Sequence, residues 1–134
     1  MIDGRGSYGG LCGPAVKPMA LNMVGEIARH EDPRDLPIPG IGGATTWRVA
    51  AEFLAMGAGN VQVCTAAMTY GFKVMQEMIS GLSQYLDETE ISLSDLVGRA
   101  VLKFVEWHHL SLTYMTRADQ PVGLHQMRPL LCRL

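Results

Sequence analysis

Two glycine-rich stretches decide the fold: Pro39-Gly40-Ile41-Gly42-Gly43 and, about twenty residues later, Gly57-Ala58-Gly59-Asn60-Val61-Gln62-Val63-Cys64-Thr65-Ala66-Ala67. Each stretch joins a short apolar strand to a turn and then to a helix. Strands that alternate with helices pair in parallel through right-handed crossovers. The sequence therefore predicts an α/β fold with at least two consecutive βα units.

Helical and strand patterns continue on both sides of these stretches. Apolar residues recur at helical spacing over residues 17–29, and short strands are predicted over 36–41 and 60–64. Thr45 or Thr46 is expected to cap the next helix, which Gly57 ends. A long helix is predicted over 69–85, and Ser92 or Ser94 is expected to cap a further helix that runs through Leu102.

The two turns have the chemistry of a phosphate site. A phosphate needs several converging N–H donors, and glycine removes the Cβ that blocks their approach. Gly42 and Gly43 stand where a helix begins, and the backbone amides of Cys64 and Thr65 follow the next strand. One Gly-Gly pair alone is typical of any tight βα turn, but two successive turns of this kind favour a phosphate site. In (β/α)8 barrels such a site is often built by the loops after the last two strands.

Size and composition restrict the alternatives. The chain has 134 residues, whereas a complete barrel of this class needs about 250. A net charge of -2 offers no field for nucleic acid, and no apolar stretch is long enough to span a membrane. Cys12, Cys64 and Cys132 are odd in number and widely spaced, which favours a reducing cytoplasm over a disulfide framework. We expect a cytoplasmic protein.

Residues suited to catalysis or metal binding are scarce. His108 and His109 are adjacent, so on a helix they point about 100° apart and do not share a metal. Cys12 lies in a glycine loop, where a reactive thiol is conceivable, and nothing pairs Glu77 with Asp87 as acid and base. We expect no catalytic residue and no metal ligand in this chain.

Three segments, taken in order, resemble one family: Tyr8-Gly9-Gly10-Leu11-Cys12-Gly13-Pro14-Ala15-Val16-Lys17-Pro18-Met19-Ala20-Leu21, Gly40-Ile41-Gly42-Gly43 and Gln62-Val63-Cys64-Thr65-Ala66. The family is the FMN-carrying subunit of NAD-dependent dihydropyrimidine dehydrogenases, relatives of dihydroorotate dehydrogenase. The resemblance runs from about Gly6 to Arg117. It implies the C-terminal part of an FMN-binding (β/α)8 TIM barrel, namely the last two βα units plus flanking helices.

The resemblance also implies a function and a set of site residues. Such enzymes interconvert uracil or thymine with the 5,6-dihydropyrimidine, using FMN and NAD(P)H, and have an NADH-oxidising flavin/iron–sulfur partner subunit in an oligomer. The 4Fe-4S clusters, NAD(P)H and FAD of the complete enzyme are expected not to bind this chain. The family's catalytic cysteine lies upstream of residue 1, so Cys12 does not inherit its role. The positions that hold the flavin phosphate and ribityl end correspond to Gly13, Ile41, Gly42, Gly43, Cys64 and Thr65.

Both ends look artificial beside this family. We expect residues 1–105 to form a partial FMN-binding barrel, 106–120 a linker toward a missing ferredoxin-like domain, and 121–134 a frameshifted tail. One choice of codons for residues 124–134, when read one nucleotide later, encodes a Cys-x-x-Cys-x-x-Cys cluster motif, which favours the last point. An ordinary divergent terminus is the other interpretation. The alternative functions are a dihydroorotate dehydrogenase-type flavoenzyme fragment and a non-catalytic phosphate- or flavin-binding remnant.

Overall fold

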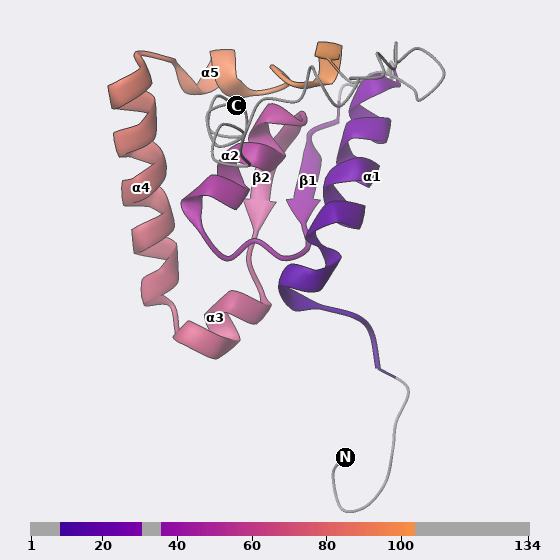
Figure 1. The fold of residues 1–134 in the computed structure, drawn as a ribbon, viewed down its shortest axis with the longest axis vertical. Coiled ribbons are helices and arrows are strands. Elements are labelled where there is room, and N and C mark those ends of the chain that lie inside the picture. Colours follow the sequence, from indigo (N-terminus) through magenta and orange to yellow (C-terminus); the bar gives the residue numbers. More distant parts are fainter. Residues whose placement is uncertain (1–8, 31–35, 104–134) are drawn as a thin grey trace, which may run out of the picture. The chain divides into compact units, whose positions relative to one another are not determined.

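Two parallel strands form the sheet of the described part of the chain. The computed structural model describes residues 9–30 and 36–103. Strand β1 (Ile38–Ile41) pairs with β2 (Ala58–Gln62), and helix α2 (Trp47–Ala55) connects them. Figure 1 shows both arrowheads at the same end of the sheet. The predicted parallel pairing is therefore confirmed, and the complete barrel remains an inference from resemblance.

The bounds of the strands follow from where each strand finds a partner. Ile38 pairs with Ala58 and Ile41 with Gln62, with an irregularity in register between Ile38 and Pro39. Beyond Ile41 the chain turns away at Gly42, whose φ is 125°. Pairing with Ile38 and Ile41 therefore sets the start of β2 at Ala58 and its end at Gln62. Both bounds lie two residues before the range predicted from the apolar pattern.

The helices match the expected order and differ in two places. A 3-10 turn (Gly13–Val16) leads into α1 (Lys17–Arg29), which has the predicted bounds. The single helix predicted over 69–85 is instead α3 (Thr65–Tyr70) and α4 (Lys73–Thr89). Gly71 separates them with a φ of 76°, and its N–H donates to the carbonyl of Ala67. A glycine with positive φ at this position is a common helix terminator.

The last predicted helix is also broken. Helix α5 (Leu93–Leu96) ends at Val97, and a separate 3-10 turn covers Val101–Lys103. The intervening backbone bonds to the end of α2 instead of continuing the helix, because Gly98 N–H donates to Leu54 O at 2.9 Å and Ala100 N–H to Ala55 O at 2.8 Å.

The two cap predictions have different outcomes. Ser92 caps α5 as predicted, accepting from the Asp95 N–H at 3.1 Å. Thr46 occupies the N-cap position of α2 but its side chain makes no capping bond, so that capping prediction was wrong. The first N–H groups of α2 are left without a side-chain acceptor from its cap residue.

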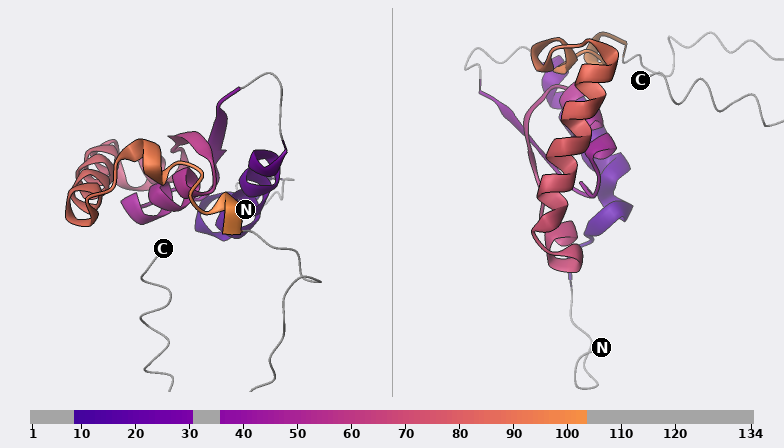
Figure 2. Two further views of the ribbon diagram at one scale, coloured as in Figure 1. Left: turned by 90° about the horizontal axis from the view of Figure 1, so that it is seen from above. Right: turned by 90° about the vertical axis from the view of Figure 1, so that its left-hand side faces the viewer.

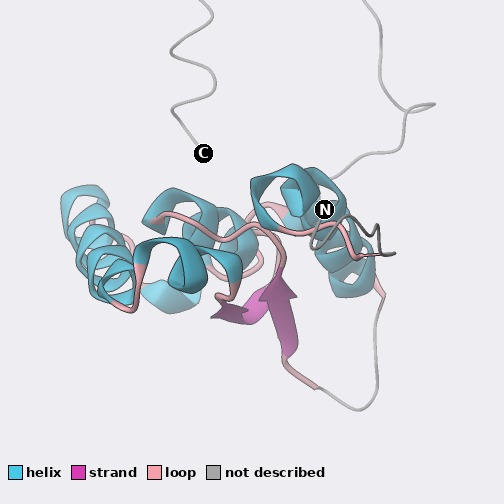
Figure 3. Ribbon diagram, turned by 90° about the horizontal axis from the view of Figure 1, so that it is seen from below, coloured by secondary structure: helices cyan, strands magenta, loops and turns pink. Residues whose placement is uncertain are grey.

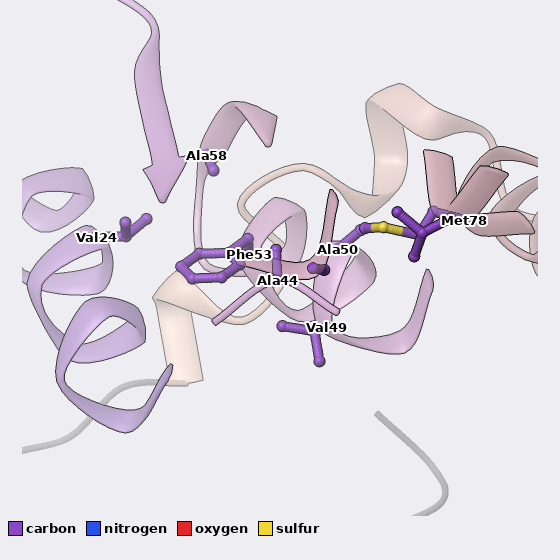
Figure 4. Packing of buried hydrophobic residues seen from close by; sticks show 9 residues of the cluster. Val24, Ala44, Val49, Ala50, Phe53, Ala58 and Met78 are labelled. Carbon is purple, nitrogen blue, oxygen red and sulfur yellow. The ribbon is translucent and has the colours of Figure 1, made fainter. Parts of the chain in front are cut away.

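The core lies between the sheet and α2. Phe53 and Ala58 are fully buried, and Figure 4 shows the Phe53 ring reaching toward Val24 of α1, with Met78 of α4 on the opposite side. A Cβ on Gly40 would lie 3.0 Å from the Cβ atoms of both Phe53 and Ala58. The small residues in the strands thus leave room for one large aromatic ring.

One face of the sheet carries no helix among the described residues. Figures 2 and 3 show the helices of the described part on one side of the two strands. The alternating residues on the other face are exposed: Pro39, Ile41, Asn60 and Gln62. In a (β/α)8 barrel the helices form the outer ring, so an open inner face is what a piece of such a barrel would present.

Helices α2 and α4 dock through an aromatic side chain that needs a glycine opposite it. Trp47 stacks obliquely on Tyr85 at 5.4 Å between ring centroids, and the guanidinium of Arg48 lies 4.6 Å from the Trp47 ring centroid. A Cβ at Gly81 would lie only 2.2 Å from Trp47 Cδ1. The docking therefore depends on the missing side chain at position 81.

Gly81→Ala tests this packing. The methyl group would force Trp47 out of its place at a cost of ~1–3 kcal/mol, which exceeds the gain of about 1 kcal/mol in helix propensity. We expect a lower free energy of unfolding in urea, followed by far-UV circular dichroism, and a changed near-UV spectrum. Ser80→Ala, at an exposed position of the same helix, should be neutral or slightly stabilising. A Gly81→Ala chain as stable as Ser80→Ala would contradict the described contact.

Candidate functional site

The turns that follow β1 and β2 meet at one edge of the sheet. Because the strands are parallel, the Gly42-Gly43 turn and the Cys64-Thr65 turn both leave from their carboxyl ends. Figure 1 shows this edge, with α3 and the start of α1 beside it. Ligands of α/β proteins commonly bind outside the carboxyl ends of parallel strands.

A third segment, distant in sequence, completes this edge. Gly13 is buried and has a φ of 74°. A Cβ on Gly13 would lie 3.6 Å from Thr65 Cγ2, and a Cβ on Gly43 would lie 2.9 Å from the Gly13 carbonyl oxygen. The structure thus brings together three of the predicted site residues, Gly13, Gly43 and Thr65, from three separate turns. We call these three residues the cradle.

Gly42 and Gly43 are glycines because the chain itself approaches them. Gly42 has a φ of 125°, and a Cβ there would lie 2.7 Å from Ala20 Cβ in α1. Gly43 has a φ of 73°, and its Cβ would lie 3.2 Å from the backbone nitrogen of Lys17. The sequence alone suggested that a ligand requires this space. In the structure the first turns of α1 fill it, and this close approach is what places Gly13 beside Gly43.

The cradle and the adjoining Cys64 offer backbone N–H donors. Within residues 9–30 and 36–103, no backbone hydrogen bond outside the helices and strands is donated by the N–H of Gly43 or Cys64. Thr65 is the first residue of α3, where helical geometry supplies no acceptor for its N–H. These donors, with the Thr65 hydroxyl, suit an anion with several oxygen atoms.

The other predicted site residues lie at the margin. Ile41 is 53% exposed on the helix-free face of the sheet, beside its partner Gln62. Cys64 is an exposed free thiol immediately before Thr65. Both residues adjoin the cradle through the chain, Ile41 through Gly42 and Cys64 directly before Thr65.

Two features near the cradle escaped the sequence analysis. Lys17 packs against Gly43 and forms an ion pair with Glu52 of α2, with 2.5 Å between Nζ and Oε2.

The second feature is a hollow of about 460 Å³ next to the cradle, beyond Pro14. Its lining includes two hydroxyls and a phenol, and its Lys73 pairs with Glu77 at 3.7 Å. The residues that line it are Pro14, Thr45, Thr46, Tyr70, Lys73, Val74 and Glu77. These residues come from three segments that are distant in sequence, so the sequence alone gives no signal of the hollow.

The described residues provide no cluster of three or more His, Cys, Asp or Glu side chains able to hold a metal ion. No helix in this part of the chain combines the length and apolarity needed to cross a membrane. His108, His109 and the predicted segments 106–120 and 121–134 lie outside the described residues.

Comparisons with known proteins show which family the sequence resembles. A family model described as dihydroorotate dehydrogenase matches residues 3–86. The chain is 43% identical over 116 residues to the NAD-dependent dihydropyrimidine dehydrogenase subunit PreA of Escherichia coli (strain K12), covering 86% of this chain and 28% of that protein.

Catalytic subunits of dihydroorotate dehydrogenase B (NAD(+)) are also similar. The Pyrococcus abyssi subunit is 43% identical over 95 residues, covering 70% of this chain and 31% of that protein. The Thermococcus kodakarensis subunit is 45% identical over 94 residues, covering 69% and 30%. The chain therefore spans about three tenths of the length of these relatives. Since the family model matches more than half of its residues, the chain belongs to the dihydroorotate dehydrogenase family.

Proposed function

We propose that this chain supplies the FMN phosphate site of an NAD-dependent dihydropyrimidine dehydrogenase, which reduces uracil or thymine to the 5,6-dihydropyrimidine or runs the reverse reaction. The observation that carries the proposal is the meeting of Gly13, Gly43 and Thr65 at the carboxyl edge of two parallel strands. The match to PreA, which extends over 86% of the chain, supports the choice of reaction.

The donor set fits the phosphate end of FMN. The N–H groups of Gly43, Cys64 and Thr65 and the Thr65 hydroxyl are neutral donors that would each contact a phosphate oxygen. Gly13 would close the cradle from the side, and Gly42 would fix the turn. Ile41, on the helix-free face of the sheet, would contact the ribityl end.

The chemistry would be divided between this chain and the rest of the enzyme. Bound FMN supplies hydride transfer. The cradle would hold the phosphate of FMN and so fix the position of the flavin. The residue that transfers a proton to the pyrimidine, the pyrimidine contacts, and the iron–sulfur and NAD(P)H sites would belong to other parts of the complete enzyme and its partner subunit.

A second candidate is dihydroorotate oxidation, favoured by identities of 43% and 45% to two catalytic subunits of dihydroorotate dehydrogenase B. A phosphate cradle would serve either enzyme, because FMN is common to both proposals. The two differ in the substrate that the complete enzyme turns over with NAD(H).

A titration of the purified chain tests the phosphate site. We expect saturable heat release with FMN in isothermal titration calorimetry. Riboflavin lacks the phosphate and should bind at least about 100-fold more weakly, because even two of the four proposed charge-assisted hydrogen bonds are worth ~3 kcal/mol. Equal affinities for FMN and riboflavin would refute a phosphate cradle. The same chain should show no NADH-dependent reduction of uracil, and measurable turnover would refute the proposed division of labour.

Thr65→Val isolates the hydroxyl contribution. Valine keeps the methyl group that packs near Gly13, so the fold should persist. Loss of one hydrogen bond to a charged phosphate is expected to weaken FMN binding about tenfold. Thr65→Ser restores the hydroxyl and should restore most of the affinity. If Thr65→Val binds FMN like the unchanged chain, the hydroxyl does not face the phosphate.

Gly43→Ala tests the close approach behind the cradle. Its φ of 73° and the contact with Gly13 O make any side chain strained. We expect a loss of about 2 kcal/mol in the free energy of unfolding and loss of FMN binding. Gly10→Ala is the matched control, since nothing lies within 4 Å of a Cβ there. Both quantities should be unchanged in Gly10→Ala, and similar behaviour of the two variants would contradict the site geometry.

A further inference from the structure

Two exposed cysteines stand directly beside the cradle. Cys12 precedes Gly13 and Cys64 precedes Thr65, and both thiols are free and exposed. Because a Cβ on Gly13 would lie 3.6 Å from Thr65 Cγ2, the two backbones pass close together one residue beyond each cysteine. Two residues separated by 51 others in sequence are thus held near each other by the fold.

Both cysteines are exposed and lie outside the helices and strands. Cys12 is extended, with φ −142° and ψ 178°, and ends an open segment in which Gly9 and Gly10 have nothing within 4 Å of a Cβ position. Cys64 is the N-cap residue of α3: its carbonyl accepts the first helical hydrogen bond, from the Met68 N–H at 3.1 Å, and its side chain makes no capping bond. A disulfide needs the two Cα atoms within about 4.4–6.8 Å. A change of backbone angles in the exposed segment before Gly13 is the movement that would bring Cys12 to this distance from Cys64.

We propose that Cys12 and Cys64 are a redox-sensitive thiol pair that closes the cradle. A low-molecular-weight disulfide such as glutathione disulfide accepts the two electrons: one cysteine thiolate attacks it and releases one glutathione. The second cysteine then attacks the mixed disulfide and releases another. The net change is loss of two hydrogens from the protein, formation of one S–S bond and reduction of one glutathione disulfide to two glutathione molecules.

The thiol pair controls access to the FMN phosphate site. Its coupling to FMN therefore rests on the proposed function. A disulfide across the turns would draw Cys12 over the N–H groups of Cys64 and Thr65. A phosphate held by those groups would in turn keep the sulfur atoms apart. Ligand binding and oxidation are therefore expected to exclude each other.

The disulfide itself is tested first, in the full chain with Cys132→Ser so that only two thiols remain. Incubation with glutathione disulfide in the dark should give a product about 2 Da lighter, and non-reducing peptide mapping should show Cys12 linked to Cys64. The linkage should form at least about tenfold more slowly in urea, where chance collision across a long loop replaces the folded contact. Mixed disulfides with glutathione alone, or equal rates with and without urea, would overturn the pair.

Coupling to the cradle is tested next. FMN should slow formation of the linkage at least about tenfold, and riboflavin should not. The oxidised chain should lose FMN binding and regain it with dithiothreitol. Cys12→Ser should bind FMN normally, and its FMN affinity should not change after treatment with glutathione disulfide. If FMN binds and the linkage never forms, the thiol pair fails and the proposed function stands. If the linkage forms rapidly while neither FMN nor riboflavin binds, the proposed function fails and the coupling falls with it.

Discussion

The contact between the Gly43 turn and the backbone of Gly13 and Lys17 is the constraint on which the rest of the site depends. A side chain at Gly43 would meet backbone atoms, at 2.9 Å from Gly13 O and 3.2 Å from Lys17 N, and backbone moves only if the whole segment moves. The ion pair of Lys17 with Glu52 holds the same segment to α2. The pair is half-buried and Glu52 Oε2 itself is covered, so the cost of desolvating both charges offsets much of their attraction. Steric fit at Gly43 therefore decides the arrangement, and the charge pair only assists it.

The core also depends on small residues packed against a large aromatic ring. A side chain at Gly40 would lie 3.0 Å from both Phe53 and Ala58, which are fully buried, so this position has no space for a larger residue. The strands thus provide little apolar area of their own, and Phe53 joins α1, the sheet and α2. Trp47 and Gly81 repeat this solution between α2 and α4. At both places a large ring fits only because its neighbour is small, so the volume of the neighbouring residue determines where the ring lies.

The sequence predicted what depends on local pattern. Helix α1 has its predicted bounds because its apolar spacing and its early proline act locally, and parallel pairing follows from alternation of strands with helices. Strand β2 was misplaced by two residues because its bounds depend on where β1 turns away. The break at Gly71 was missed because an apolar period continues across it, although glycine was the available signal. The convergence of Gly13 with Gly43 and Thr65 was expected only through resemblance to a family. No local pattern connects residues so far apart.

A cradle made of backbone donors explains how a short βα unit could carry a cofactor site. Backbone N–H groups need no particular side chain, so the sequence requirement reduces to glycine where chains approach and to one hydroxyl at Thr65. The proton transfer that accompanies hydride transfer to a ring instead needs a titratable side chain placed within hydrogen-bond reach of the reacting atom. Anchoring and reaction therefore make different demands on sequence. Under the proposed function, this chain, which belongs to the dihydroorotate dehydrogenase family, contributes the anchor.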